Sequence, residues 1–173
     1  DPVLKVDLPR VKTELNREVE KRRVLLTSLI DTKLYEDQGL LKGPAERALV
    51  GDERAILITK RVVGSSERFA DLLRAEGVEP PRKISPAWMK KPKDERRDED
   101  KYAYAFAKDD EKFVNLPDDI EALSVGLNLA KVADVKKLAA RQARLRALVD
   151  CRLAVKSTTN VTRAERFLEA GKN

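Results

Sequence analysis

The side chains that most often perform acid–base and metal chemistry are nearly absent from this sequence. Its 173 residues include no histidine and one cysteine, Cys151. Histidine titrates near neutral pH and is a frequent metal ligand, so its absence excludes Ser-His-Asp and Cys-His catalysis and zinc sites that use histidine. One cysteine also excludes an intrachain disulfide and a four-cysteine zinc site within the chain. We expect Cys151 to be a small core residue of a helix rather than a reactive thiol.

Motifs that bind phosphate, nucleotide or cations are also missing. The sequence holds no Walker loop, dinucleotide fingerprint, kinase or metalloprotease signature, or nucleophile elbow. Gly64-Ser65-Ser66 precedes an expected helix but lacks the glycine-rich run and lysine of a phosphate loop. The acids at 94–100 lack the spacing of an EF-hand. We therefore expect no enzyme activity, no catalytic residues, no metal site and no cofactor.

The composition favours helices. Charged residues make up 38% of the chain, hydrophobic residues 42% and aromatic residues only 5%. Such values are typical of helices with narrow apolar stripes and wide solvated faces, whereas sheets are richer in aromatic and β-branched residues. No apolar run approaches the roughly 18 residues that a membrane-spanning helix needs. The sequence therefore predicts an all-α fold of helical hairpins joined by an extended, Pro-rich and charged connector.

Apolar spacings of three and four residues place the helices. They divide the chain into an N-terminal helical region at 1–76, the connector at 77–115 and a basic helical region at 116–173. Ile56-Leu57-Ile58 could also form a strand, but its surroundings favour a helix. The expected helices cover residues 10–34, 44–63, 66–76, a stretch that begins at Leu116, residues 131–155 and a short segment that ends at Gly171.

The connector carries four prolines within residues 77–92, and we therefore expect that stretch to be extended and not a helix. These prolines surround Trp88, the only tryptophan, which we expect to anchor this segment to the chain's own core or to a partner. Residues 90–101 are almost wholly charged, a composition that predicts disorder in isolation. Tyr102, Tyr104 and Phe106 alternate with alanine, and they form either a short strand or an aromatic anchor in an extended arm.

The basic excess lies at the C-terminal end. Residues 122–173 contain 11 basic and 4 acidic side chains, a net charge of +7. In the expected helix at 131–155, Lys137, Arg141, Arg144 and Arg152 fall opposite the apolar stripe. Such a face is either a solubilising surface or a site for RNA phosphates, anionic lipid or an acidic protein.

Residues 35–104 resemble the matrix-side helical accessory subunit of mitochondrial ubiquinol–cytochrome c reductase. That family combines an acidic segment, two helices with paired charges, and a Pro-x-x-Trp-x-Lys segment followed by acids and a tyrosine. The similarity implies a non-catalytic role, bracing membrane and peripheral subunits against each other. The basic region at 116–173 and an added helix before Trp88 depart from the pattern. The matching segments are Tyr35-Glu36-Asp37, Glu46-Arg47, Asp52-Glu53-Arg54, Lys60-Arg61, Pro86-Ala87-Trp88-Met89-Lys90 and Asp98 to Tyr102.

These observations predict a structural accessory subunit of a large assembly. The resemblance suggests a mitochondrial inner-membrane energy-transducing complex, respiratory or ATP synthase, with the chain on the matrix side. The first residue is Asp1 rather than Met, as expected of a processed or trimmed chain. The alternative is an organellar ribosomal or other RNA-binding protein that uses the basic helix. The candidate partner-contact residues are Trp88, Tyr102, Tyr104, Phe106, Lys137, Arg141, Arg144 and Arg152.

Overall fold

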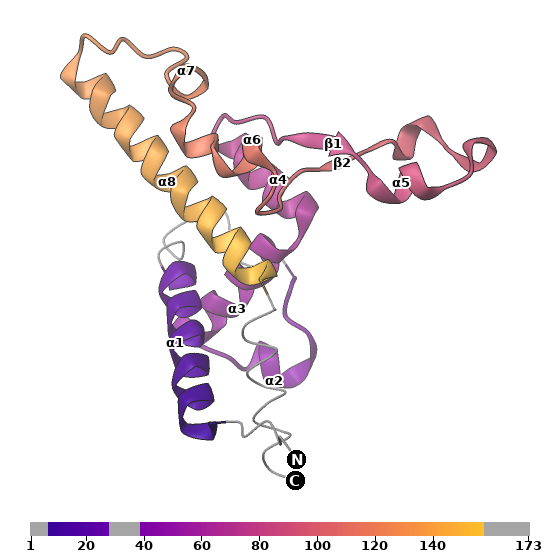
Figure 1. Ribbon diagram of the computed structural model, residues 1–173. Helices are drawn as coiled ribbons and strands as arrows, with labels where there is room; N and C mark the ends of the chain where they lie inside the picture. Colours follow the sequence, from indigo (N-terminus) through magenta and orange to yellow (C-terminus); the bar gives the residue numbers. More distant parts are fainter. Residues whose placement is uncertain (1–6, 28–38, 158–173) are drawn as a thin grey trace. The chain divides into compact units, whose positions relative to one another are not determined.

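The computed structural model describes residues 7–27 and 39–157 of the chain. Of these residues, 68% are helical and 4% lie in strands, so the all-α class is confirmed (Figure 1). The chain divides into two compact units. One unit holds the residues up to Gly64 and those from Asp150 onward, and the other is Ser65–Val149.

These boundaries differ from the expected regions 1–76, 77–115 and 116–173. The helix α8 (Val132–Lys156) contributes its last turns to the first unit and the rest to the second. Residues 77–115 are not a separate linker, because their aromatic side chains pack against α4 (Ser66–Ala75) within the second unit. The connector also contains strands and short helices, so its prolines and charges marked neither extended backbone throughout nor a domain boundary.

Three helices and the end of α8 form the first unit. Helix α1 (Leu8–Thr27) is capped by the preceding Asp7, whose carboxylate accepts a hydrogen bond from the Arg10 N–H at 3.2 Å. The helix packs against α3 (Gly51–Gly64). It confirms the helix expected at 10–34 as far as Thr27; residues 28–34 lie outside the described residues. Among the described residues of this unit, the buried apolar side chains are Leu26, Ile58, Val62, Val63, Cys151 and Val155.

The single helix expected at 44–63 is two helices. α2 (Gly43–Arg47) ends before residues 48–50, and α3 starts at Gly51, which has a φ of +63°. Only glycine adopts that conformation readily, so Gly51 separates the two helices. Residues 56–58 are helical, as predicted, and the burial of Cys151 confirms its expected place in the core.

An ion pair joins α2 to α3. The two guanidinium nitrogens Nη1 and Nη2 of Arg61 each donate to a carboxylate oxygen of Glu46, and Nη1 also donates to the Leu40 carbonyl at 2.6 Å. The Lys42 N–H donates to the same carboxylate. The hydrogen bonds from Arg61, more than any other cause, lower the pKa of Glu46 to about 2, and the carboxylate in turn raises the pKa of Arg61.

The second unit begins with α4, whose ends follow the sequence prediction for residues 66–76. The Ser65 hydroxyl caps its first turn by accepting from the Arg68 N–H. Gly77 has a φ of +78°, which allows its N–H to donate to the Arg74 carbonyl and the Val78 N–H to donate to the Leu73 carbonyl. This pair of bonds is a Schellman motif, and Val78 is buried beside it.

An aromatic cluster lies at the centre of the second unit. The Phe69 ring of α4 meets the rings of Phe106 and Phe113 edge-on, at centroid distances of 5.0 and 5.9 Å. Phe106 also stacks on Tyr104 at 5.1 Å. Phe113 belongs to α6 (Glu111–Val114) and is completely buried together with Phe69. A chain with few aromatic residues thus concentrates them where α4 meets the connector.

After α6, the chain of this unit continues through η4 (Leu116–Asp118) and α7 (Ile120–Leu123) into α8. The helix expected from Leu116 is broken, because Asp119 caps α7 through the Ala122 N–H and Gly126 adopts a φ of +78°. The expected helix at 131–155 is confirmed as α8. Within the described residues, no helix has the length and apolar character needed to cross a membrane.

Glu46 gives a pH-dependent prediction. Its folded pKa of about 2 lies below the usual 4.5, so its stabilising effect is present above pH 4.5 and is lost as pH falls towards 2. Glu46→Gln should therefore lower the free energy of unfolding at pH 7, and the difference from the native chain should shrink between these values. Denaturant unfolding of the variant and the native chain, at pH values from 7 down to 2, measures this difference.

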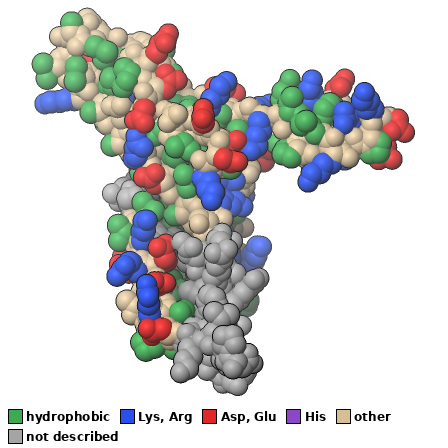
Figure 2. Space-filling view, viewed as in Figure 1, with side chains coloured by type: hydrophobic (Ala, Val, Ile, Leu, Met, Phe, Trp, Pro, Cys, Tyr) green, Lys and Arg blue, Asp and Glu red, His purple; other side chains and the backbone are tan. Residues whose placement is uncertain are grey.

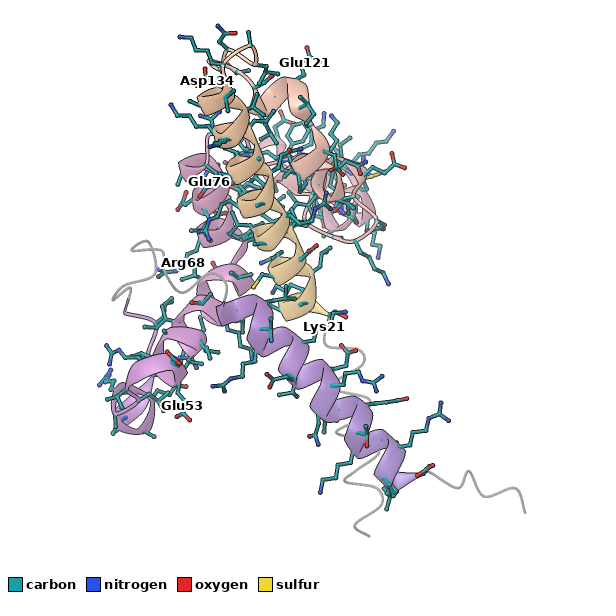
Figure 3. The ribbon with its side chains drawn as sticks, turned by 90° about the vertical axis from the view of Figure 1, so that its left-hand side faces the viewer. Lys21, Glu53, Arg68, Glu76, Glu121 and Asp134 are labelled. Atoms are coloured by element: carbon teal, nitrogen blue, oxygen red, sulfur yellow. The ribbon has the colours of Figure 1, made fainter. Side chains whose placement is uncertain are left out.

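The exposed Glu53 of α3, labelled in Figure 3, provides the control. Glu53→Gln should change stability little at any of these pH values. A difference between Glu46→Gln and the native chain that stays constant from pH 7 to pH 2 would contradict the proposed role of the ion pair.

Candidate interaction surface

The connector contains a two-stranded arm, here defined as residues 82–104. Strand β1 (Arg82–Ile84) pairs antiparallel with β2 (Tyr102–Tyr104), and the register places Ile84 opposite Tyr102. Between the strands lie α5 (Pro86–Lys90) and the 3-10 turns η2 (Lys93–Glu95) and η3 (Asp98–Asp100). Figure 1 shows the ribbon leading away from α4 and α6 to α5. Of the two interpretations of the alternating aromatic residues, the strand is observed at 102–104.

The expectation that the connector holds no helix is wrong at α5. Ser85 accepts a hydrogen bond from the Trp88 N–H, and Pro86 occupies the first turn, where its missing N–H costs nothing. Pro86, one of the prolines that suggested extended backbone, here forms the start of a helix together with Ser85. The helix is only 5 residues long, which is too short for hydrophobic periodicity to reveal it.

Hydrogen bonds to the backbone fix residues 90–101, whose composition alone predicts disorder. Arg96 donates to the Met89 carbonyl at 2.7 Å and to the Lys91 carbonyl at 3.0 Å, at the end of α5. Its guanidinium lies 4.8 Å from the centre of the Trp88 ring. The indole Nε1 of Trp88 donates to the Arg97 carbonyl at 2.8 Å. Charged and aromatic side chains therefore take the place of an apolar core here.

A second set of polar contacts holds the base of the arm. Lys83 Nζ lies 3.0 Å from both carboxylate oxygens of Asp110, and that carboxylate also accepts from the Ala107 N–H. Arg74 of α4 donates to the Tyr104 hydroxyl at 3.1 Å, and this bond is the main cause of the raised pKa of Arg74. The arm is thus joined to α4 and to the segment before α6 by charge-assisted bonds as well as by the aromatic cluster.

One face of the arm remains apolar and basic. Ile84 and Tyr102 are register partners, so their side chains lie on the same side of the ribbon, and 43% and 58% of them are exposed. Lys101 Nζ lies 5.6 Å from the Tyr102 ring and 5.8 Å from the Trp88 ring. We call Ile84, Trp88, Lys101 and Tyr102 the arm face; Met89 of α5 is exposed as well. Figure 2 shows hydrophobic side chains among lysines and arginines on the visible side of the arm.

The structure separates the four aromatic candidates. Tyr102 is exposed, whereas Trp88 and Tyr104 are half-buried in contacts within the chain. Phe106 is buried in the aromatic cluster, so its side chain is not available to a partner, and its candidacy as a contact residue is corrected. Phe106 lies two residues beyond the end of β2, where the chain has entered the core and no longer belongs to the exposed ribbon.

The basic residues of α8 also differ from expectation. Arg141 donates to the Leu123 carbonyl at 2.8 Å, and Arg144 pairs with Glu76 at 3.2 Å, beside α8 in Figure 3. Arg152 is buried and donates to the Val63 carbonyl at 2.8 Å; its burial lowers its pKa. Lys137 is exposed, with its Nζ 3.9 Å from Asp134.

The predicted separation of a basic side from an apolar side of α8 is therefore wrong. Arg141 stands four residues before Leu145 and Arg144 four residues before Leu148, two leucines that are fully buried. Residues at these spacings share one helix face, so the arginines border the buried side instead of opposing it. Only Lys137 of the four proposed contacts on this helix has a mostly exposed side chain.

Sequence reasoning missed Ile84, Met89 and Arg96. Ile84 has no apolar neighbour in Arg82-Lys83-Ile84, and three residues are too few to show the alternation of a strand. Arg96 stands within a run of charges that gives no sign of its contacts. Within the described residues, no three cysteine, aspartate or glutamate side chains lie close enough together to hold a metal ion.

Comparisons with known proteins add no family to this description. No protein-family model, no curated protein and no solved structure matches the chain.

The contacts of Arg96 generate a prediction about the arm. Arg96→Ala removes two charge-assisted hydrogen bonds, each worth about 1.5–3 kcal/mol, and the packing on Trp88. The N–H groups of Met89, Lys91 and Glu95 should then exchange with solvent at least about tenfold faster, as measured by hydrogen–deuterium exchange. Exchange in α4 should not change.

Arg97→Ala is the matched control. The Arg97 side chain is 71% exposed and pairs only with the exposed Glu99 among the contacts of the described residues. This variant should leave exchange in α5 close to that of the native chain. Equal effects of the two variants would contradict a specific role of Arg96.

Proposed function

We propose that this chain is a non-catalytic structural subunit of a large multiprotein assembly and that the arm face binds a partner protein. The observation that carries the proposal is an arm fixed by its own polar contacts while Ile84, Met89 and Tyr102 stay exposed. A pre-ordered surface loses little entropy on binding, and aromatic side chains next to cations are enriched at the centres of protein interfaces.

The use of the charged side chains supports protein recognition over RNA binding. The RNA-binding alternative requires the α8 arginines to reach phosphates. Arg141 and Arg152 instead donate to backbone carbonyls, and Arg144 pairs with Glu76. Binding RNA through these groups would break contacts that hold the fold.

We further propose that the assembly is a mitochondrial inner-membrane energy-transducing complex, respiratory or ATP synthase, with the chain on its matrix side. Support comes from the resemblance of residues 35–104 to the accessory subunit of ubiquinol–cytochrome c reductase. The corresponding segment here, Pro86-Ala87-Trp88-Met89-Lys90, forms α5 in the arm, with one residue instead of two between proline and tryptophan. The charged pairs at 46–47 and 52–54 lie in α2 and α3. Tyr35-Glu36-Asp37 lies outside the described residues.

The test combines a double substitution with the native mass of the protein. Ile84→Asp with Tyr102→Asp places two buried charges in the proposed interface, so the affinity should fall by about 2 kcal/mol or more, roughly thirtyfold. On native gels of cell extracts, the tagged native chain should migrate with a large complex and the variant as free chain near its own mass of 19.5 kDa.

Val50→Asp is the control, because Val50 is 79% exposed and lies outside the arm. It should assemble like the native chain. Mass spectrometry of the band should identify respiratory-chain or ATP synthase subunits, and ribonuclease should leave the band unchanged. A band that collapses with ribonuclease, or a native chain that migrates alone, would overturn the proposal.

A further inference from the structure

A second exposed surface lies at the turn between α7 and α8. The twelve residues from Ala122 to Ala133 contain one charged side chain, Lys131, in a chain that is 38% charged. Most of them are exposed, including Val125 at 74% and Val132 at 71%. Solvated turns in such a chain should be charged, so this segment is anomalous. We call residues 120–136 the corner; its exposed large apolar side chains are Ile120, Val125, Leu129, Val132 and Val135.

The backbone of the corner is fixed by its own hydrogen bonds. Gly126 adopts a φ of +78°, and the Leu127 N–H donates to the Ser124 carbonyl. The Asn128 N–H donates to the Asp134 carboxylate at 2.8 Å, and the Asn128 side chain accepts from the Ala130 N–H at 3.1 Å. N–H groups that already have partners lower the cost of moving this turn out of water.

Two exposed lysines of the corner can bind an anionic ligand surface. Lys131 and Lys136 are exposed, and neither has an ion pair among the described residues. The carboxylate of Asp134 binds the Asn128 N–H and lies 3.9 Å from Lys137. Asp118 pairs with Arg146 and Asp119 caps α7.

Glu121 is the acid at this end of the unit that takes part in none of these contacts. Figure 3 labels it on α7 and Asp134 on α8. Figure 2 shows hydrophobic side chains gathered over this end of the unit, beside a basic one. An apolar turn with lysines next to it is typical of protein segments that enter the boundary between lipid headgroups and acyl chains.

We propose that the corner binds the surface of a bilayer that contains anionic lipid. Val125, Leu129 and Val132 enter the boundary between headgroups and acyl chains, and Lys131 and Lys136 bind lipid phosphates. Removing apolar side chains from water and pairing lysines with anionic headgroups both favour this state. The proposal concerns the chain alone and does not depend on the arm face, so either proposal can fail without the other.

The test is co-sedimentation of the full chain with vesicles of phosphatidylcholine, with or without phosphatidylglycerol. The native chain should bind the anionic vesicles. The triple variant Val125→Asn, Leu129→Asn, Val132→Asn should bind at least about tenfold more weakly. Lys131→Gln with Lys136→Gln should lose about fivefold for each lysine, on anionic vesicles only. Val50→Asn is the control for an exposed valine outside the corner, and circular dichroism verifies that each variant is folded.

The insertion of the corner into the bilayer can be distinguished from electrostatic adsorption to the bilayer surface. The chain has one cysteine, and Cys151 is buried, so Val125→Cys provides the accessible thiol for an environment-sensitive dye. Its fluorescence should rise when anionic vesicles are added, whereas the dye on Val50→Cys should not respond.

Several results would overturn the proposal. They are no binding by the native chain, binding that the triple asparagine variant retains in full, or a dye at position 125 that stays in water. The proposal is also overturned if the corner is covered by a second copy, which a doubled mass in solution, lost in the triple variant, would reveal.

Discussion

The structure depends on arginine side chains that bind the carbonyl groups at helix ends. The last carbonyls of a helix have no partner within it, and its C-terminal end carries partial negative charge. In this chain, arginines from elsewhere in the sequence supply the missing donors for four helices. The donor and acceptor pairs are Arg54 with Arg47 at α2, Arg152 with Val63 at α3, Arg96 with Met89 at α5, and Arg141 with Leu123 at α7. A chain with few aromatic residues can hold several short helices in this way.

This use of arginine changes what the charge of the chain means for function. The excess of +7 in residues 122–173 suggested a basic surface, yet Arg141, Arg144 and Arg152 are bonded within the fold. Exposed apolar side chains lie on the arm face and at the corner, as well as on α1 and at Val50. The two proposals, a partner protein at the arm face and a bilayer at the corner, therefore do not use these three arginines of α8, which make contacts within the fold.

The sequence predicted best where one local rule decided the structure. The long helices α1 and α8 followed from periodicity, and the end of α4 followed from Gly77. Prediction failed where side-chain contacts without a periodic pattern decided the structure. Arg96 bonds the end of α5 from within a run of charges, and the buried side of α8 includes arginines whose acceptor carbonyls lie up to 89 residues away. Of the candidate site, Tyr102 was found on the surface and Phe106 in the core, because alternation alone does not show where a strand ends.

The unfolding free energy of Arg152→Lys tests this account most directly. Lysine keeps the positive charge but lacks the planar guanidinium that binds the Val63 carbonyl from a buried position. In denaturant unfolding, we expect the free energy of unfolding of Arg152→Lys to be about 2 kcal/mol lower than that of the native chain, because a hydrogen bond that involves a charged group is removed. Lys137→Arg, at an exposed position of the same helix, should change stability by less than about 0.5 kcal/mol. Equal stability of Arg152→Lys and the native chain, together with weaker binding to RNA, would contradict the structural role of these arginines.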